Sequence, residues 1–383
     1  MLAPRQLMLI LAAVFLDALA YAMLIPLTPA FGVEVGFGQS GAGLILGVYA
    51  VGLFAAVLPL ALFGNACPGR PLLTLGVALL ISSLLIYPLA DNFVLLLVAR
   101  LLQGAASGIL WTAGLALLAE DPQPQRRGRN MGLVVSSFSA GLTLGPPAAG
   151  LLATFGPNHA FYLPVALCLA LPWMLGHQHR PTRTAATSPG NNVPLLALLR
   201  DPACRLYGLA VATTAFAMGF LEPVLPTWLA DTHGVGTLGS GLMFGLLALS
   251  LALATPLAGA RLANIEPARL LRRGFLALAL LTAGLIILPM ALIVILVIGF
   301  GLLCGLLLAP TMPGLAMRVE RLGGRNYAVI FALFNLSFAS GLAAGPLLGG
   351  AIAEGFGGPT SLLLLAAVLV GISAMLPRQS LRD

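Results

Sequence analysis

Three ionisable side chains lie deep inside long apolar segments of this 383-residue chain, and they are the residues best suited to chemistry. Asp17 and Glu222 are carboxylates that can bind and release a proton, whereas Arg100 stays charged. An Arg or Asp at the centre of an apolar helix costs about 2.5 to 3.5 kcal/mol, so such a residue is expected to face a cavity or a partner. We therefore treat all three as candidates for proton coupling and substrate binding.

Each of these residues also has a purely structural interpretation, and the sequence leaves both open. Asp17 could pair with Arg100 without titrating, or Arg100 could hydrogen-bond the carbonyl groups of a neighbouring helix. Gln103 lies one turn from Arg100 on the same helical face and could join either network. Glu222 directly precedes Pro223, which frees a carbonyl group on the preceding turn and favours a hinge, but Glu222 could instead reach water near an interface.

The segments that must hold these residues have the composition of membrane helices. Hydrophobic residues make up 59% of the chain, charged residues only 8%, and the mean hydropathy is +1.02. A soluble domain carries about 25% charged residues, so this chain cannot cover a water-facing surface. The net charge of +7 comes from arginines scattered over short connections, which excludes a basic nucleic-acid-binding domain.

A bilayer core about 30 Å thick needs roughly 20 apolar residues in a helix. On this basis the sequence predicts twelve membrane-spanning helices, and the first of them is expected to be retained and not cleaved as a signal peptide. The predicted spans are 6–30, 41–63, 71–90, 93–119, 130–154, 159–176, 204–230, 237–260, 268–290, 291–317, 326–350 and 357–376.

The basic residues predict the orientation of these spans. All 19 are arginines, and all except Arg100 fall at a terminus, in an even-numbered connection or at its edge. The positive-inside rule then predicts that both termini are cytoplasmic, and the alternation requires an even number of spans. The lack of lysine beside abundant Ala, Gly, Arg and Pro is typical of a GC-rich bacterial genome. The expected location is a bacterial cytoplasmic (inner) membrane.

The chain also predicts two halves joined by a linker. The polar connection 177–203 separates an N-terminal six-helix bundle (1–176) from a C-terminal one (204–383). Pro26 in the first span matches Pro223 in the seventh at an offset of 197 residues, and a Gly-x-x-x-Gly-Pro motif recurs in spans 5 and 11. Such a repeat is typical of transporters whose substrate site lies at the midplane between the halves.

Two further sets of residues follow from these patterns. Glycines three or four residues apart let helices pack closely, and prolines bend them, so the recurring motif predicts a packing and gating role. Aromatic and amide side chains near the charged residues are candidates to line a substrate cavity, and Tyr21 suits an organic cation. The packing set is Gly141, Gly145, Pro146, Gly341, Gly345 and Pro346. The cavity set is Tyr21, Gln103, Trp111, Phe220, Phe334 and Asn335.

Four short motifs carry a resemblance to a known family. They are Arg100-Leu-Leu-Gln103-Gly104 in span 4, Gly141-x-x-x-Gly145-Pro146 in span 5, Leu16-Asp17 with Ile25-Pro26-Leu27-x-Pro29 in span 1, and Leu221-Glu222-Pro223-Val224-Leu225-Pro226 in span 7. With these motifs the chain resembles the major facilitator superfamily along its whole length, in particular the twelve-span proton-coupled drug antiporters and the branch containing the vesicular amine transporters.

The resemblance implies the major facilitator fold and a secondary active transporter that exports a small amphipathic or cationic organic compound in exchange for protons by alternating access. It also implies proton-coupling roles for Asp17, Glu222 and Arg100. The chain departs from that branch at several places. Ala66 and Cys67 replace charged or amide residues after span 2, and no carboxylate occupies the positions of Asn335 and Met317.

Other classes of function fit the sequence less well. A dedicated metabolite or siderophore exporter of the same fold is the nearest alternative, and a non-transporting membrane sensor is a further one. An enzyme is not expected, because no HExxH-like cluster or GxxxxGK[ST] motif occurs. The four cysteines have no metal-ligand spacing. The sequence thus predicts no metal or cofactor, and a monomer whose partners are a small-molecule substrate, protons and the lipid bilayer, with no nucleic acid.

Overall fold

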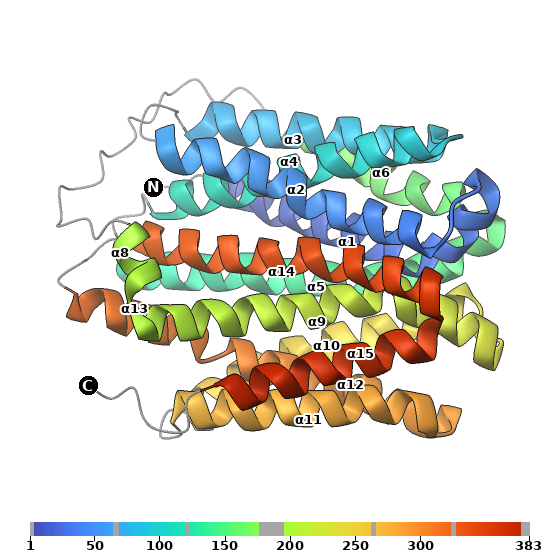
Figure 1. Ribbon diagram of the computed structural model, residues 1–383. Coiled ribbons are helices and arrows are strands. Elements are labelled where there is room, and N and C mark those ends of the chain that lie inside the picture. Colours follow the sequence, from blue (N-terminus) through green and yellow to red (C-terminus); the bar gives the residue numbers. More distant parts are fainter. Residues whose placement is uncertain are drawn as a thin grey trace. The chain divides into compact units, whose positions relative to one another are not determined.

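The computed structural model describes residues 4–63, 69–119, 123–175, 195–261, 266–322 and 327–376, and all regular structure in these ranges is helical (Figure 1). Ten of the described helical segments are long and apolar enough to cross a membrane. The chain divides into two compact units. Unit 1 comprises residues 1–186 with 235–245, and unit 2 comprises residues 187–234 with 246–383.

Unit 1 is built on long helices that pack in pairs. Helix α1 packs against α5, and α4 packs against both α2 and α3. The elements are α1 (Pro4–Val35), α2 (Gln39–Phe63), α3 (Gly69–Ile86), η2 (Tyr87–Leu89), α4 (Phe93–Ala119), α5 (Pro124–Leu152), η3 (Ala153–Phe155), η4 (Asn158–Phe161), α6 (Tyr162–Cys168) and α7 (Leu171–Leu175).

Unit 2 repeats this pairing. Helix α9 packs against α14, and α11 packs against α12 and α15. The elements are α8 (Leu195–Arg200), α9 (Pro202–His233), α10 (Thr237–Arg261), α11 (Pro267–Ile287), α12 (Met290–Leu308), α13 (Thr311–Arg321), α14 (Tyr327–Phe356) and α15 (Gly358–Met375). The first turns of α10 group with unit 1, where Gly241 and Gly245 lie close to Pro146 and Pro147 of α5.

The predicted glycine motif forms the same helix crossing in both units. A Cβ atom on Gly141 of α5 would overlap the backbone of Phe15 and Leu19 on α1. A Cβ atom on Gly341 of α14 would overlap the backbone of Ala212 and Phe216 on α9, which are the matching residues 197 positions later. The internal repeat read from the sequence therefore corresponds to repeated packing, because only glycine allows two helix backbones to come this close.

Two predicted spans are interrupted, and proline accounts for both breaks. In place of one helix over 159–176, the structure has η4, α6 and α7, and α6 ends at Cys168, four residues before Pro172. In place of one helix over 291–317, α12 ends at Leu308 and α13 begins after Pro310. A proline lacks the backbone N–H, and its ring collides with the carbonyl group four residues earlier.

The start and end of α9 show how the sequence delimits a span. Asp201 is the N-cap residue and accepts a hydrogen bond from the Cys204 N–H at 3.0 Å, while Pro202 occupies the first helical turn. Gly234 ends the helix in the left-handed conformation, with φ of 63°. Of the predicted linker 177–203, residues 177–194 lie outside the described residues, as do Ala66 and Cys67.

Candidate functional site

The buried Arg100 of α4 is the centre of a polar cluster inside unit 1. Its side chain is 0% exposed, and its guanidinium carbon lies 4.4 Å from the ring centroid of Tyr21 on α1. The same carbon lies 4.9 Å from the ring centroid of Tyr49 on α2. The two rings are 4.6 Å apart and tilted by 57°, so the cation lies against two aromatic faces.

Gln103 links the arginine to the helices around it. Its Oε1 atom accepts hydrogen bonds from Arg100 Nη1 at 2.9 Å and from the Tyr87 hydroxyl at 2.8 Å. Its Nε2 atom donates to the backbone carbonyl group of Asp17 at 3.3 Å. Both polar atoms of the amide thus form hydrogen bonds, and the amide fixes α4 to α1 and to the η2 turn after α3.

Asp17 lies at the edge of this cluster and is 0% exposed. The Tyr49 hydroxyl group donates to its Oδ2 atom over a long distance of 3.4 Å, and its Oδ1 atom has no hydrogen-bond partner among the residues described. The Tyr49 side chain that donates to this carboxylate also lies against the Arg100 guanidinium, which brings a positive charge into the same cluster. With so few direct donors, this carboxyl group stays ionised only while a cation is nearby, and without one its protonated form is favoured.

Helical spacing brings these residues together. Asp17 and Tyr21 are four residues apart on α1, and Arg100, Gln103 and Ser107 occupy one face of α4 at spacings of three and four. The helices can approach because Gly104 has no side chain, and a Cβ atom there would overlap the backbone of Tyr49. The sequence prediction that Gln103 shares a face with Arg100, and Tyr21 with Asp17, agrees with the structure.

The cluster balances a large cost against several contacts. Arginine at the centre of an apolar helix costs about 2.5 to 3.5 kcal/mol. A desolvated cation–π contact contributes up to about 2 kcal/mol, and a hydrogen bond to a charged group about 1.5 to 3 kcal/mol. These contributions offset the cost only while the partners stay in place, so a helix movement that separates them changes the energy of the charged state.

The sequence reasoning missed three members of this cluster. Tyr49 and Tyr87 are fully or almost fully buried tyrosines whose hydroxyl groups need a partner, which is the signal that could have identified them. Ser107, 1% exposed, lies beside the Asp17 carboxyl group and continues the polar face of α4. None of the three carries a charge, so a search for buried ionisable residues passes over them.

Glu222 lies on α9 of unit 2. It is 6% exposed in the middle of α9, directly before Pro223. Because Pro223 has no N–H, the carbonyl group of Gly219 lacks its usual helical donor. A Cβ atom on Gly219 would lie 2.8 Å from the ring of Pro346 on α14, so this weakened turn packs against the proline of the repeated motif.

The other predicted cavity residues lie at several separate places. Trp111 is half-buried on α4 and packs edge-on against Phe138 at 5.2 Å. Phe220 is 2% exposed and lies against Gly345 and Gly349 of α14, which is a helix-packing position. Phe334 stacks on Phe338 at 6.2 Å and packs against the apolar cluster at the first turns of α9, and the adjacent Asn335 is half-buried.

The described part of the chain contains no group of three or more His, Cys, Asp or Glu residues that could hold a metal ion. Cys168, Cys204 and Cys304 are buried and free. The buried Asp17 carboxyl group of the Arg100 cluster can bind and release a proton, and it can also bind a cation.

The sequence profile described as Major Facilitator Superfamily matches residues 10–339. The human vesicular acetylcholine transporter is 28% identical over 294 residues, covering 74% of this chain and 55% of the relative. The rat synaptic vesicular amine transporter is 25% identical over 306 residues, covering 78% of this chain and 59% of the relative. The chain thus matches little more than half the length of these relatives.

Solved structures show the same fold at low sequence identity. A bacterial homolog to the human lysosomal transporter Spinster, in an inward-facing and unoccupied conformation, superposes with a TM-score of 0.78 at 14% identity, covering 98% of this chain and 96% of that one. The human organic anion transporter MFSD10 superposes with a TM-score of 0.69 at 18% identity, covering 98% of this chain and 100% of that one.

Proposed function

Because the chain belongs to the Major Facilitator Superfamily, we propose that it is a secondary active transporter that exports a small amphipathic or cationic organic compound in exchange for protons. It would work by alternating access and would make no covalent change to its substrate. The observation that carries the proposal is the fully buried cluster of Asp17 and Arg100, which is expensive to keep in a membrane helix and is expected where ions or protons move.

Asp17 is the first proton-coupling residue in this proposal. A carboxyl group sealed among apolar helices is stable when it binds a proton or when a cation lies close to it. Arg100 supplies that cation in the arrangement described above. A movement of α4 away from α1 would withdraw the positive charge, and Asp17 would then take up a proton. The reverse movement would release the proton on the other side of the membrane.

Glu222 is the second proton-coupling residue. It lies beside the proline-weakened turn of α9, where the backbone can bend with little loss of hydrogen bonding. A proton on Glu222 would favour one shape of this turn, and a cationic substrate beside the ionised carboxylate would favour another. Proton and substrate would therefore compete, and the binding of one would expel the other.

The proposed substrate class rests on charge and on aromatic surface. The relatives are named as transporters of acetylcholine and of amines, which are organic cations. The Tyr21 and Tyr49 rings already hold a cation in the form of the Arg100 guanidinium, so an organic cation could bind the same ring faces once Arg100 moves. Asn335, where the resemblance implies a carboxylate, favours a substrate other than those of the relatives.

The proposed orientation follows the arginines. In unit 1, Arg5 and Arg126 lie in the first turns of α1 and α5. In unit 2, Arg269 lies in the first turn of α11 and Arg321 ends α13. The acids Glu34 and Asp231 lie in the last turns of α1 and α9. By the positive-inside rule the arginine-bearing ends face the cytoplasm, and so do both termini. The proposed location is a bacterial cytoplasmic membrane.

The proposal can be tested with purified protein in vesicles carrying a pH gradient. Tetraphenylphosphonium, acetylcholine and a monoamine serve as probe cations, and an internal pH-sensitive dye reports proton release. We expect at least one cation to drive proton release in the wild type. Asp17→Asn and Glu222→Gln should abolish it, because neither variant can load and unload a proton at that site.

Asp91→Asn is the matched control, since Asp91 is an exposed acid in a connection, where it bonds to Asn92. Proton release unchanged in both Asp17→Asn and Glu222→Gln would overturn the coupling assignment. Response to several unrelated cations would indicate a broad drug exporter. Response to none of the probes, with proton release driven by a single metabolite or siderophore, would favour the dedicated exporter.

A further inference from the structure

A groove at one end of unit 2 holds two arginines that the proposed transport cycle does not use. It lies between the first turns of α11 and the last turn of α15, two helices that pack side by side (Figure 1), and its volume is about 440 Å³. The residues that line it are Arg272, Arg273, Leu276, Val370, Ser373 and Ala374.

The positive charge in this groove is not compensated by the described protein. The neighbouring arginines are paired, Arg269 with Glu266 at 3.4 Å and Arg318 with Asp201 at 2.9 Å. Within the ranges that the structure describes, Arg272 and Arg273 form no ion pair, and no carboxylate lines the groove. Two adjacent guanidinium groups without an acid form a site for an anion with several oxygen acceptors.

The groove is apolar one turn deeper along the same helices. Leu276 and Val370 are each 44% exposed, and Leu280, the next residue along this face of α11, is 67% exposed. In a helix that spans a membrane, exposed leucine and valine side chains face lipid tails. The groove therefore joins a charged end to an apolar wall, which is the shape of a phospholipid headgroup followed by its acyl chain.

A hydrogen bond ties the two walls of the groove together. The Ser373 hydroxyl group of α15 donates to the backbone carbonyl group of Arg272 at 2.8 Å, and Ser373 is 6% exposed. Ser373 and Ala374 are small, so the end of α15 leaves room beside the guanidinium groups. The site is thus fixed in width before any ligand binds, which reduces the entropy lost on binding.

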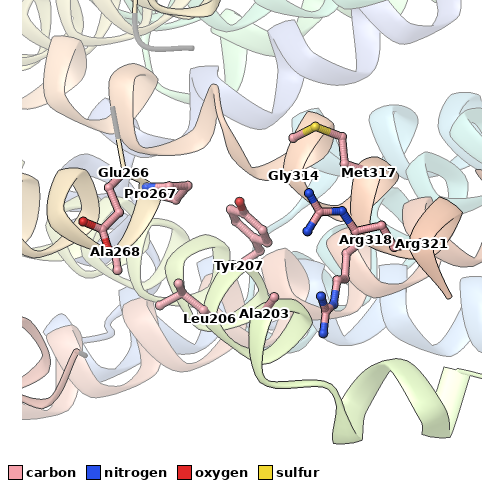
Figure 2. Close-up of a pocket in the computed structure, with 10 residues that line it drawn as sticks. All are labelled: Ala203, Leu206, Tyr207, Glu266, Pro267, Ala268, Gly314, Met317, Arg318 and Arg321. Atoms are coloured by element: carbon pink, nitrogen blue, oxygen red, sulfur yellow. The ribbon is translucent and has the colours of Figure 1, made fainter. Parts of the chain in front are cut away.

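A second cavity at the same end of unit 2 makes a useful contrast (Figure 2). It has a volume of about 180 Å³ and is lined by Tyr207, Arg318 and Arg321, but also by Glu266. Figure 2 shows Glu266 on one side of Tyr207 and the two arginines on the other. Because Arg318 is engaged by Asp201 and an acid is present, this cavity is a poor site for an anion.

We propose that the groove between α11 and α15 binds the phosphate of an anionic glycerophospholipid. Arg272 and Arg273 would hold the phosphate oxygens, and one acyl chain would lie along Leu276 and Val370. A zwitterionic lipid would bind less well, because no carboxylate is among the described residues that line the groove to receive its ammonium group, and the arginines repel it. This lipid site on α11 and α15 does not depend on whether transport is coupled to protons.

Lipid binding to the intact protein in detergent can be measured by native mass spectrometry. Phosphatidylglycerol is compared with phosphatidylcholine of the same acyl chains. Two arginines near a membrane surface predict a preference of about thirtyfold for the first phosphatidylglycerol molecule. Arg272→Ala with Arg273→Ala should reduce this preference to within about threefold, since only weaker, non-specific contacts remain. If that pair expresses poorly, Arg272→Gln with Arg273→Gln removes the same charge and keeps side-chain length.

The matched control is Arg269→Ala with Arg321→Ala, which removes the same charge from the same end of unit 2. It should keep the wild-type preference. An equal loss in this control, or no loss in the groove variant, would overturn the proposal. Inorganic phosphate is tested as a competitor. If phosphate alone displaces phosphatidylglycerol, the groove binds a soluble anion and the lipid assignment is wrong, whereas no displacement supports it.

Discussion

The crossing of α4 with α2 in unit 1 has an equivalent in unit 2, the crossing of α12 with α10, but the side chains around the two crossings are chemically different. In unit 1, Cβ atoms on Gly104 and Gly108 of α4 would meet the backbone carbonyl groups of Tyr49 and Leu53 on α2. In unit 2, Cβ atoms on Gly301 and Gly305 of α12 would meet those of Leu247 and Leu251 on α10. The glycines match at an offset of 197 residues and the carbonyl groups at 198, so the crossing is conserved within the chain.

The side chains around the two crossings differ. Applying the same offsets to five members of the Arg100 cluster gives five residues in unit 2 that are buried and uncharged. Asp17, Tyr49, Arg100, Gln103 and Ser107 correspond to Thr214, Leu247, Val297, Phe300 and Cys304.

Unit 2 forms the crossing with valine, leucine and phenylalanine, so the charge in unit 1 is not required for close packing. Replacing a buried ion network with apolar residues of similar volume is often neutral or stabilising. Unit 1 therefore keeps Asp17 and Arg100 at an energetic cost, which supports a role in transport and not in folding.

The largest expected effect breaks the cluster in unit 1. Arg100→Leu leaves the Asp17 carboxyl group, the Gln103 amide and the Tyr87 hydroxyl group buried with fewer partners. We expect the free energy of unfolding to fall by about 3 to 5 kcal/mol, the range seen when one partner of a buried charge pair is removed. Thermal unfolding in detergent, followed by intrinsic fluorescence, measures the change.

The control for this prediction imitates unit 2. Arg100→Val with Asp17→Thr and Gln103→Phe installs the side chains found at the matching positions, and it should recover much of the lost stability while remaining inactive in the vesicle assay. If the triple variant is as unstable as Arg100→Leu, the cluster is needed for folding and the contrast between the units does not hold.

A smaller effect tests the feature that the two units share. Gly104→Ala and Gly301→Ala each place a methyl group against a backbone carbonyl, and we expect each to lower the free energy of unfolding by about 1 to 3 kcal/mol. Gly132→Ala is the control, because a Cβ atom there meets nothing within 4 Å. A large loss at Gly104 with none at Gly301 would show that the two crossings are not equivalent.

The smallest expected effect concerns Asp201 at the end of unit 2, whose charge is paired with Arg318, whereas the charge of Arg100 in unit 1 is fully buried. Arg318 holds Asp201 through contacts of 2.9 Å from both Nε and Nη2. Burial alone would raise the pKa of Asp201, but the hydrogen bonds from Arg318 and from the Cys204 N–H outweigh it, so this pKa lies below its usual value. Asp201 therefore stabilises the fold most when ionised.

The stabilisation by Asp201 should be constant at neutral pH and should decline as the pH falls below about 4 and through the lowered pKa. Asp201→Asn should cost about 1 kcal/mol at pH 7, because it weakens both the helix cap and the ion pair, and less at low pH. Melting temperatures of the two proteins across this pH range test the prediction. A difference that grows on acidification would contradict it.

Much of the fold and part of the site could be read from the sequence. Long apolar segments fixed the spans, since lipid leaves a chain few alternatives to the helix, and α4 matches its predicted range of 93–119. Spacing put Arg100 and Gln103 on one face. The breaks before Pro172 and at Pro310 were missed, because hydropathy is continuous there and only the lost hydrogen bonds interrupt the helix.

Residue type and spacing by themselves determined that this protein is helical, lies in a membrane, repeats itself and buries three ionisable groups. Only the tertiary structure decided that Tyr49 and Tyr87 join the site, that the Tyr21 ring holds Arg100, and that Arg272 and Arg273 lie in a groove that no described acid lines. The reason is physical: hydropathy and helical periodicity act within one segment, whereas the partner of a buried polar group is chosen by which helices cross, and glycine contacts far apart in the chain set those crossings.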